Sequence, residues 1–406
     1  MRRKKILAVA VAGALGGAAG AAFAAGGAES SYSIYGKLYP QVTSWDYSGA
    51  TRPGTTQSDL ISGTASADTQ GRASIDVSNS RIGFRGSESL GGSLKAIFQI
   101  ETRVRFDTGA GNLWAGGRDS FIGLTGSVGT LKLGNMDTAY KQAGDTVSFL
   151  GISSGNFVSS SSVLSEGPFT DLSFHVRQPN VIMYESPKLA GLQFLGSWGK
   201  DELKGSPNHS FNRLLNSYAV TYEMGSLYLA LAYEKQHDFF PYDNSDNVTL
   251  DNPTTGANVR SNDNATRFTV NYTLGQTLLY LDVAQIELKD TGTIAAGNFT
   301  GYKNKRFALG VQQKFGNITA QASVVNSDQG TCTREGGVSC STTGLEGRHY
   351  NIGASYAFSR RTQAFALISK LDQGVSASYS ITASGVAEAQ VGEDVTAIAV
   401  GVNHNF

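Results

Sequence analysis

Residues 94–103 read LKAIFQIETR, and this stretch decides the fold class. Side chains alternate along it, with Leu94, Ala96, Phe98 and Ile100 on one face and Lys95, Gln99, Glu101 and Arg103 on the other. Successive side chains of a β-strand point to opposite faces, so one face of this strand is apolar and the other is charged. A charged face is hard to bury in a soluble core, but it suits a barrel wall between lipid and water.

The same alternation recurs along the chain. In the preceding segment, Ile82 and Phe84 oppose Arg81 and Arg85. Segments of about ten residues with this pattern predict sixteen strands, with boundaries uncertain by about two to four residues. They lie near 32–42, 81–85, 94–103, 118–126, 129–136, 177–186, 191–199, 216–224, 226–235, 265–274, 277–288, 304–315, 317–326, 348–358, 362–371 and 395–406.

Short and long connections alternate between these strands. The short links fall at 88–92, 127–128, 187–190, 225, 275–276, 316 and 359–361, and the long polar stretches at 45–71, 107–117, 137–176, 200–215, 236–264, 289–303, 327–347 and 372–394. Transmembrane barrels place short turns at the periplasmic side and long loops outside. We therefore predict an all-β, transmembrane antiparallel barrel of sixteen strands with both termini on the periplasmic side.

The N-terminus predicts export. Arg2, Arg3, Lys4 and Lys5 precede an apolar, small-residue run, and Ala22-Phe23-Ala24 offers a cleavage site after Ala24. This layout is typical of a secretory signal peptide, so we expect a leader at 1–24 and one barrel domain at 25–406. Without the leader, 29 basic residues face 33 acidic ones, and this mild acidity argues against a nucleic-acid partner.

No apolar stretch after the leader approaches the roughly 18 residues that suggest a spanning helix. Because backbone polar groups must be paired in lipid, only helices and closed barrels cross it. An exported, polar, alternating chain fits the barrel. A soluble exported β-protein remains the alternative, since length alone does not exclude it.

Cys332 and Cys340 lie eight residues apart in a segment rich in Gly, Ser and Thr. In an exported chain this spacing predicts a small disulfide loop. A metal site would need further ligands nearby, and the sequence suggests none and no cofactor. The histidines are scattered and propose no catalytic arrangement with a nucleophile, so we expect no enzyme activity; they are His175, His209, His237, His349 and His404.

Several short motifs resemble the Gram-negative porin family, most closely the trimeric general porins of β-proteobacteria. The similarity spans essentially the whole mature chain. The matching stretches are Tyr35-Gly36-Lys37, SRIGFRGSE at 80–88, LGGSLKA at 90–96, FIGL at 121–124, GTLKLG at 129–134 and GVNHNF at 401–406.

This resemblance implies an outer-membrane channel for passive diffusion of small hydrophilic solutes and ions. It implies a homotrimer in contact with membrane lipid and lipopolysaccharide. It also implies that the third long loop, 137–176, folds into the lumen as a constriction, and that Phe406 acts as a terminal signal for the assembly machinery.

Basic residues on the barrel wall are the candidate filter. Matching the family's motifs indicates Lys37, Arg81, Arg118 and Arg177, and inward-facing positions add Arg85, Arg103 and Lys132. Acidic partners on the loop would be Asp145, Glu166 and Asp171. Opposed charges set ion preference in a pore, and the excess of bases favours anions. Any one base can equally be inward simply because that face meets water.

Two other functions fit the same barrel. A substrate-specific channel would use a binding ladder, and lumen-facing Tyr35 and Tyr39 would stack on sugars. An adhesin or ligand-binding barrel would use the long loops 45–71 and 236–264.

Overall fold

The computed structural model describes residues 30–61, 63–77, 79–109, 117–152, 156–168, 173–200, 213–239, 258–294, 298–381 and 388–406. The expected leader at 1–24 and the candidate acid Asp171 lie outside these described residues, so both stay predictions.

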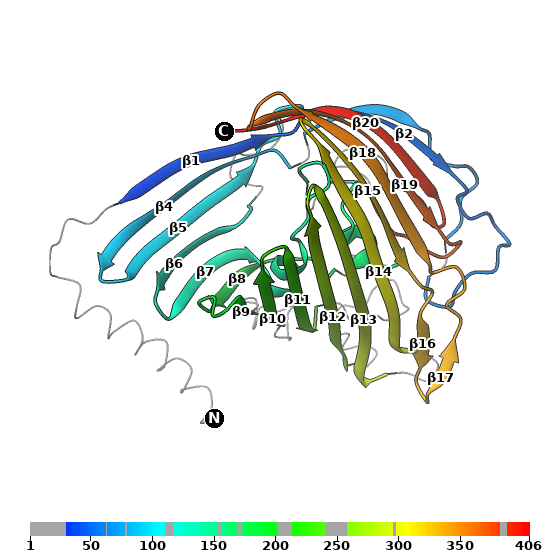
Figure 1. Ribbon diagram of the computed structural model, residues 1–406. Helices are drawn as coiled ribbons and strands as arrows, with labels where there is room; N and C mark the ends of the chain where they lie inside the picture. Colours follow the sequence, from blue (N-terminus) through cyan, green and yellow to red (C-terminus); the bar gives the residue numbers. More distant parts are fainter. Residues whose placement is uncertain are drawn as a thin grey trace.

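One antiparallel sheet forms the described chain and curls into a ring (Figure 1). Its elements are β1 (Ser31–Leu38), β2 (Gln41–Ser48), β3 (Arg72–Asp76), β4 (Arg81–Gly91), β5 (Leu94–Arg103), β6 (Ser120–Gly126), β7 (Gly129–Asp137), α2 (Ala139–Gly144), α3 (Ser161–Leu164), β8 (Arg177–Glu185), β9 (Leu192–Lys200), β10 (Leu214–Met224), β11 (Leu227–His237), β12 (Asn258–Leu274), β13 (Thr277–Thr293), β14 (Phe299–Phe315), β15 (Ile318–Ser327), β16 (Thr331–Arg334), β17 (Val338–Cys340), β18 (Gly347–Ala357), β19 (Thr362–Gln373) and β20 (Asp394–Asn405).

The first and last strands close the barrel. β20 pairs with β2 along 394–401 and with β1 at 404–405, and Phe406 exchanges two backbone hydrogen bonds of 3.1 Å with Gly36. β1 and β2 are two parts of one barrel strand, as are β3 and β4, while β16 and β17 form a hairpin at the outer end of β14. The wall therefore has sixteen strands, and the prediction of a closed sixteen-stranded antiparallel barrel is confirmed.

The first two barrel strands differ from their predicted bounds. The first extends to Ser48, inside the predicted loop 45–71, and the second begins at Arg72, well before the predicted segment 81–85. Each is interrupted once, the first at Tyr39-Pro40 and the second near Asn79, which has φ of 67°. Proline cannot donate a ladder hydrogen bond, and a positive φ bends the chain, so the regular period is lost at both places.

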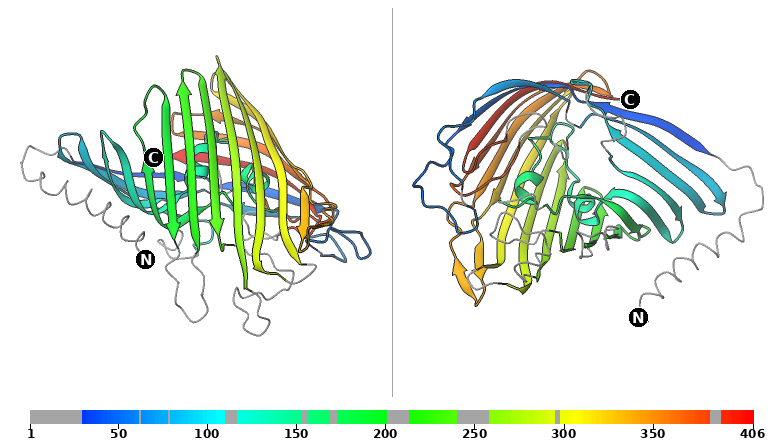
Figure 2. Two further views of the ribbon diagram at one scale, coloured as in Figure 1. Left: turned by 90° about the horizontal axis from the view of Figure 1, so that it is seen from below. Right: turned by 180° about the vertical axis from the view of Figure 1, so that it is seen from behind.

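Alternation along β14 shows how the wall is built. Phe307, Leu309 and Val311 are 37–46% exposed on the outward face. Arg306 and Ala308 between them are 1% and 0% exposed and point inward. β12, β13 and β14 each have 17 residues and are longer than predicted, because polar residues on the outward face of their outer ends break the apolar period (Figure 2).

The third long connection occupies the lumen. It carries α2, which lies against β9 to β12, and α3, which lies against β14, β15 and β18. Between the helices, Phe149, Ile152 and Phe157 are at most 5% exposed and join a cluster with wall residues of β2, β13, β14, β15, β19 and β20. Neither of these helices, nor any other helical segment in the described ranges, is long and apolar enough to cross a membrane.

Candidate functional site

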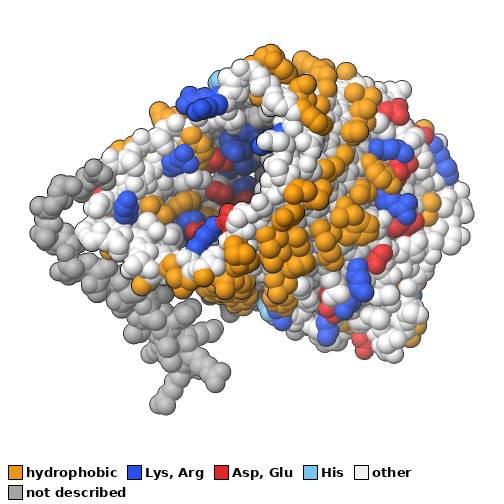
Figure 3. All heavy atoms as spheres, in the orientation of Figure 1, with side chains coloured by type: hydrophobic (Ala, Val, Ile, Leu, Met, Phe, Trp, Pro, Cys, Tyr) orange, Lys and Arg blue, Asp and Glu red, His pale blue; other side chains and the backbone are white. Residues whose placement is uncertain are grey.

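A row of bases crosses the three neighbouring strands β1, β4 and β5. Its first member, Lys37, is 5% exposed and donates to the backbone carbonyl of Gly151 in the loop. Lys37 of β1 pairs in register with Arg81 of β4, which pairs with Arg103 of β5. Paired residues on one face of a sheet lie about 4.5–5.5 Å apart between Cβ atoms, so these three charges are neighbours. Figure 3 looks into the hollow of the molecule, where Lys and Arg side chains lie beside Asp and Glu side chains.

Glu101 of β5 is the counter-ion within this row. Its carboxylate is 8% exposed, pairs with the Arg118 guanidinium, lies 3.4 Å from Arg81 Nε, and accepts the Tyr35 hydroxyl at 2.9 Å. The alternation places Glu101 on the same face as Arg103, and this is the signal by which the sequence reveals it. It was not among the predicted acids, because those were sought on the loop alone.

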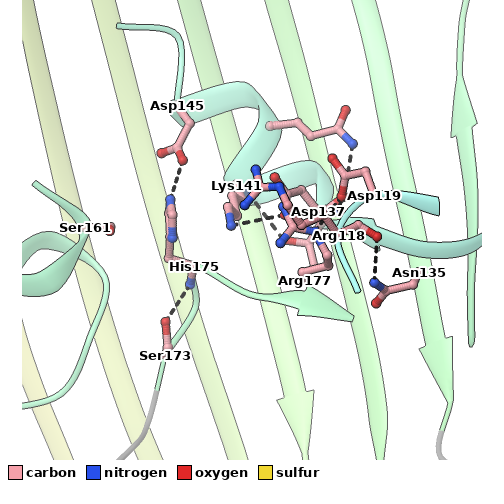
Figure 4. Close-up of polar contacts among 12 residues, drawn as sticks. Arg118, Asp119, Asn135, Asp137, Lys141, Asp145, Ser161, Ser173, His175 and Arg177 are labelled. Atoms are coloured by element: carbon pink, nitrogen blue, oxygen red, sulfur yellow. Dashed lines mark hydrogen bonds and ion pairs between the residues drawn. The ribbon is translucent and has the colours of Figure 1, made fainter. Parts of the chain in front are cut away.

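A second group lies beside the first, around Arg177 at the start of β8. Its guanidinium binds Asp119 through Nε at 2.7 Å and Asp137 through Nη2 at 2.8 Å. Asp137 also pairs with Lys141 of α2 at 3.0 Å. Figure 4 shows these side chains converging at the base of α2. The loop thus leaves the wall from a charged cluster.

Arg118 does not follow strand alternation. β6 begins only at Ser120, and the residues before it join β5 by an isolated bridge at Gly117. Arg118 therefore turns its side chain to Glu101 while the adjacent Asp119 binds Arg177. Ile122, two residues into the strand, is 65% exposed on the outer face.

The two other predicted bases lie apart from this cluster. Arg85 is exposed, lies 4.8 Å over the Tyr35 ring, and its Nε donates to Ser33 at 3.2 Å. Lys132 of β7 pairs with Glu185 of β8 at 2.6 Å. Lys132 is thus locally neutralised, whereas Arg85 extends the basic face toward the β4–β5 turn.

The predicted loop acids have partners away from the basic row. Asp145 hydrogen-bonds to His175 and lies 3.4 Å from Arg267 of β12, which is 2% exposed and also binds Asp282 of β13 at 2.9 Å. The backbone carbonyl of Glu166 accepts from Arg306 of β14. Arg267 and Arg306 were not predicted, and a role for Asp145 and Glu166 in orienting solutes stays a prediction.

Burial and charge act together on the loop pair. Burial lowers the pKa of His175, so its imidazole is neutral near pH 7, although Asp145 opposes this effect. Burial of Asp145 disfavours its charge, but His175 and Arg267 together hold its pKa below the usual range. The pair is therefore a hydrogen bond from a neutral imidazole to an ionised carboxylate (Figure 4).

The loop also covers one of the two predicted sugar-stacking rings. Tyr39 is 0% exposed, stacks on Phe365 with ring centroids 4.6 Å apart, and donates its hydroxyl to the Leu150 carbonyl at 3.3 Å. The expectation that Tyr39 offers its ring to solutes is wrong, because the loop seals it from the lumen. Tyr35 is held between Glu101 and Arg85.

Cys332 of β16 and Cys340 of β17 lie directly opposite in register and are joined by a disulfide, with Cα atoms 5.1 Å apart. The described residues hold no group of three or more His, Cys, Asp or Glu side chains placed to bind a metal ion. Phe406 lies against Gly36 at the barrel seam, and its part in assembly stays a prediction.

Comparison with known proteins places the chain in a family. The family model described as Gram-negative porin matches residues 8–376. The chain belongs to the Gram-negative porin family. The predicted resemblance is confirmed, and this porin is a diffusion channel of the Gram-negative outer membrane.

A curated relative agrees with this assignment, and solved structures agree with the fold. The porin is 26% identical over 329 residues to the major outer membrane protein P.IB of Neisseria lactamica, covering 80% of this chain and 83% of that protein. Its fold matches an anion-selective porin from Comamonas acidovorans with a TM-score of 0.66 at 19% identity, covering 93% of this chain and 100% of the other. It also matches the trimer form of OmpT from Vibrio cholerae, with a TM-score of 0.62 at 14% identity, over 93% and 99% of the two chains.

Proposed function

We propose that this porin passes small anions in preference to cations, and that the wall cluster sets this preference. Five bases (Lys37, Arg81, Arg103, Arg118 and Arg177) gather on one side of the lumen with three acids (Glu101, Asp119 and Asp137). This excess of positive charge beside the loop that enters the lumen is the observation that carries the proposal.

The location of the charge matters more than the total. Low-dielectric walls focus the field of charges in a narrow pore. Charges on the outer loops are screened, since the Debye length is about 10 Å at ~0.1 M salt. The basic cluster therefore governs permeation even though the expected mature chain carries more acids than bases.

The test is the reversal potential of a planar bilayer under a salt gradient. Wild-type protein should give the sign of anion preference, and Arg81→Ser combined with Arg177→Ser should move it toward zero or beyond. Lys132→Ser serves as the matched control, because Lys132 is neutralised by Glu185 outside the cluster. An unchanged permeability ratio in the double variant would refute the assignment.

Two further parts of the proposal concern partners. A homotrimer is supported by the trimer form of OmpT, whose fold this chain shares. Contact with lipopolysaccharide is supported by the outer-membrane location, where the barrel's apolar band must end against that lipid. Chemical cross-linking of the purified barrel in detergent should give a three-chain species, and a single-chain species would contradict the trimer.

A further inference from the structure

Three neighbouring side chains on the lumen face of β11 and β12 each keep a buried oxygen that has no hydrogen-bond partner among the described residues. They are Glu234 and Gln236 of β11 and Asp263 of β12, and all three are 0% exposed. Gln236 and Asp263 lie directly opposite in register, and Glu234 is the next residue on the same face of β11. Opposite residues on one face have Cβ atoms about 4.5–5.5 Å apart, so the three side chains form one cluster.

The hydrogen bonds of Gln236 fix the direction of its amide. Nε2 donates to the Ser173 carbonyl at 3.0 Å and to Glu234 Oε1 at 2.8 Å. An amide nitrogen carries two hydrogens, so Nε2 is fully used, and the reverse orientation would set an oxygen against two acceptors. Oε1 of Gln236 therefore points away from both acceptors, and it receives no hydrogen bond within the described ranges.

Both carboxylates also keep one oxygen in this condition. Asp263 Oδ1 accepts the backbone N–H of Lys289 at 3.1 Å, but Oδ2 has no partner in the described part of the chain. The same is true of Glu234 Oε2, although the Thr138 and Ser217 hydroxyls lie near this carboxylate. The cluster thus presents acceptor oxygens and lacks donors to meet them.

No base forms an ion pair with either acid within the described ranges, because the bases of this region pair elsewhere. Lys141 binds Asp137 at 3.0 Å, and Arg260 binds Asp238. A buried carboxylate without a counter-charge is strongly disfavoured. The cluster therefore needs added positive charge, and its unpartnered oxygens mark the place for it.

We propose that Glu234, Gln236 and Asp263 bind one Ca²⁺ ion. Carboxylate and amide oxygens are the ligands that Ca²⁺ takes, and its coordination tolerates an irregular set. One divalent ion neutralises the two carboxylates, and the Ser261 hydroxyl near Asp263 adds a neutral oxygen. Mg²⁺ fits less well, because it demands near-octahedral geometry and keeps several waters. With two carboxylates and one amide, this ligand set differs from a group of three or more acidic or imidazole side chains.

The ion lies at the base of the loop that enters the lumen. Gln236 donates to Ser173 on the return limb of the loop (Figure 4). On the outgoing limb, the backbone N–H of Tyr140 donates at 2.8 Å to the Ser217 hydroxyl, which lies near Glu234. Ca²⁺ thus joins β11 and β12 at the point where both limbs of the loop are held.

The test is equilibrium dialysis of radioactive Ca²⁺ against barrel that is refolded in detergent without lipopolysaccharide and stripped of metal with EDTA. The wild-type chain should bind one Ca²⁺. Asp263→Asn should bind at least about tenfold more weakly, the loss usual even for a residue that only supports a metal ligand. Glu287→Gln is the matched control, because Glu287 lies at the same level on the outward face of β13, between the buried Ile286 and Leu288.

The control should bind Ca²⁺ as tightly as wild type, and an equal loss in it would overturn the proposal. So would wild-type affinity in Asp263→Asn. If protons neutralise the acids instead, the wild-type chain will bind no Ca²⁺, and the proposal fails. If Asp263→Asn does not fold, Gln236→Met carries the test, with roughly a tenfold loss expected and wild-type affinity overturning the site.

Two further measurements make the result specific. Ca²⁺ should raise the urea midpoint of the wild-type barrel in phosphatidylcholine vesicles, because a ligand that binds only the folded state stabilises it. The midpoint of Asp263→Asn should not move, and an equal rise in both proteins would place the ion elsewhere. Mg²⁺ at the same concentration should displace little Ca²⁺, and equal competition would overturn the choice of ion.

Discussion

The two sides of the lumen use their arginines differently. On the far wall, which includes β12 and β14, Arg267 and Arg306 are 2% and 1% exposed and bind the loop. On the near wall, which includes β1, β4 and β5, Arg81 and Arg103 stay partly exposed to the channel. The same residue type thus holds the loop on one side and stays partly exposed on the other. What differs is whether loop backbone or water faces the guanidinium.

Removing Arg267 should have the largest effect. Arg267→Met leaves Asp282 and Asp145 without their buried partner, which costs about 3–5 kcal/mol in the free energy of unfolding. Arg306→Met is the matched variant, because its partners among the described residues are neutral oxygens. It should cost about 1–3 kcal/mol. Urea unfolding of the barrel in lipid vesicles measures both, and equal losses would contradict the distinction.

Within the described residues the near wall offers a finer comparison, between Arg177, which forms two ion pairs, and Arg103, which forms none. Arg177→Gln and Arg103→Gln each remove one positive charge, so both should lower anion preference in reversal-potential measurements. Only Arg177→Gln leaves Asp119 and Asp137 without a guanidinium. Its free energy of unfolding should fall by about 1–3 kcal/mol, while that of Arg103→Gln stays near wild type. A larger stability loss for Arg103→Gln would reverse the assignment of roles.

The smallest expected effect is a pH dependence of loop anchoring. Because the pKa of His175 is lowered in the folded protein, the unfolded chain binds a proton first as pH falls below about 6.5. Stability should therefore be full above that pH and decline below it, by no more than about 1.4 kcal/mol per pH unit, until the lower folded pKa is reached. Asp145 contributes only in stronger acid, since its ordinary pKa is about 3.9 and its folded pKa is lower.

His175→Gln tests this linkage. Its unfolding free energy should lose the slope below about pH 6.5 that the wild-type protein shows. The same slope in both proteins would assign the dependence to other groups.

Strand alternation predicted the wall well but not the partners within it. Glu101 and Arg103 were placed inward because a period of two is a local property. That Arg177 meets Asp119 and Asp137, and that Arg267 meets Asp145, depends on register across strands and on the path of the loop. Neither the register nor the loop path can be predicted from the sequence of a single strand. Pro40 and Asn79 lie where the first two barrel strands are interrupted, and only the pairing with neighbouring strands shows that each strand continues beyond the interruption.

The far wall holds the loop mainly through hydrogen bonds to the backbone of the loop. Wall side chains donate to carbonyl oxygens at Gly144, Ser148, Leu150, Phe157, Val158 and Val163. Every amino acid has a backbone carbonyl oxygen, so most substitutions along the loop leave these hydrogen bonds in place. The side chains of the loop can therefore change during evolution while its backbone keeps the same path through the lumen. Gly144 and Gly151 are exceptions, since a methyl group would fall 2.1 Å from the Arg267 guanidinium at Gly144 and 2.6 Å from Asn403 Nδ2 at Gly151.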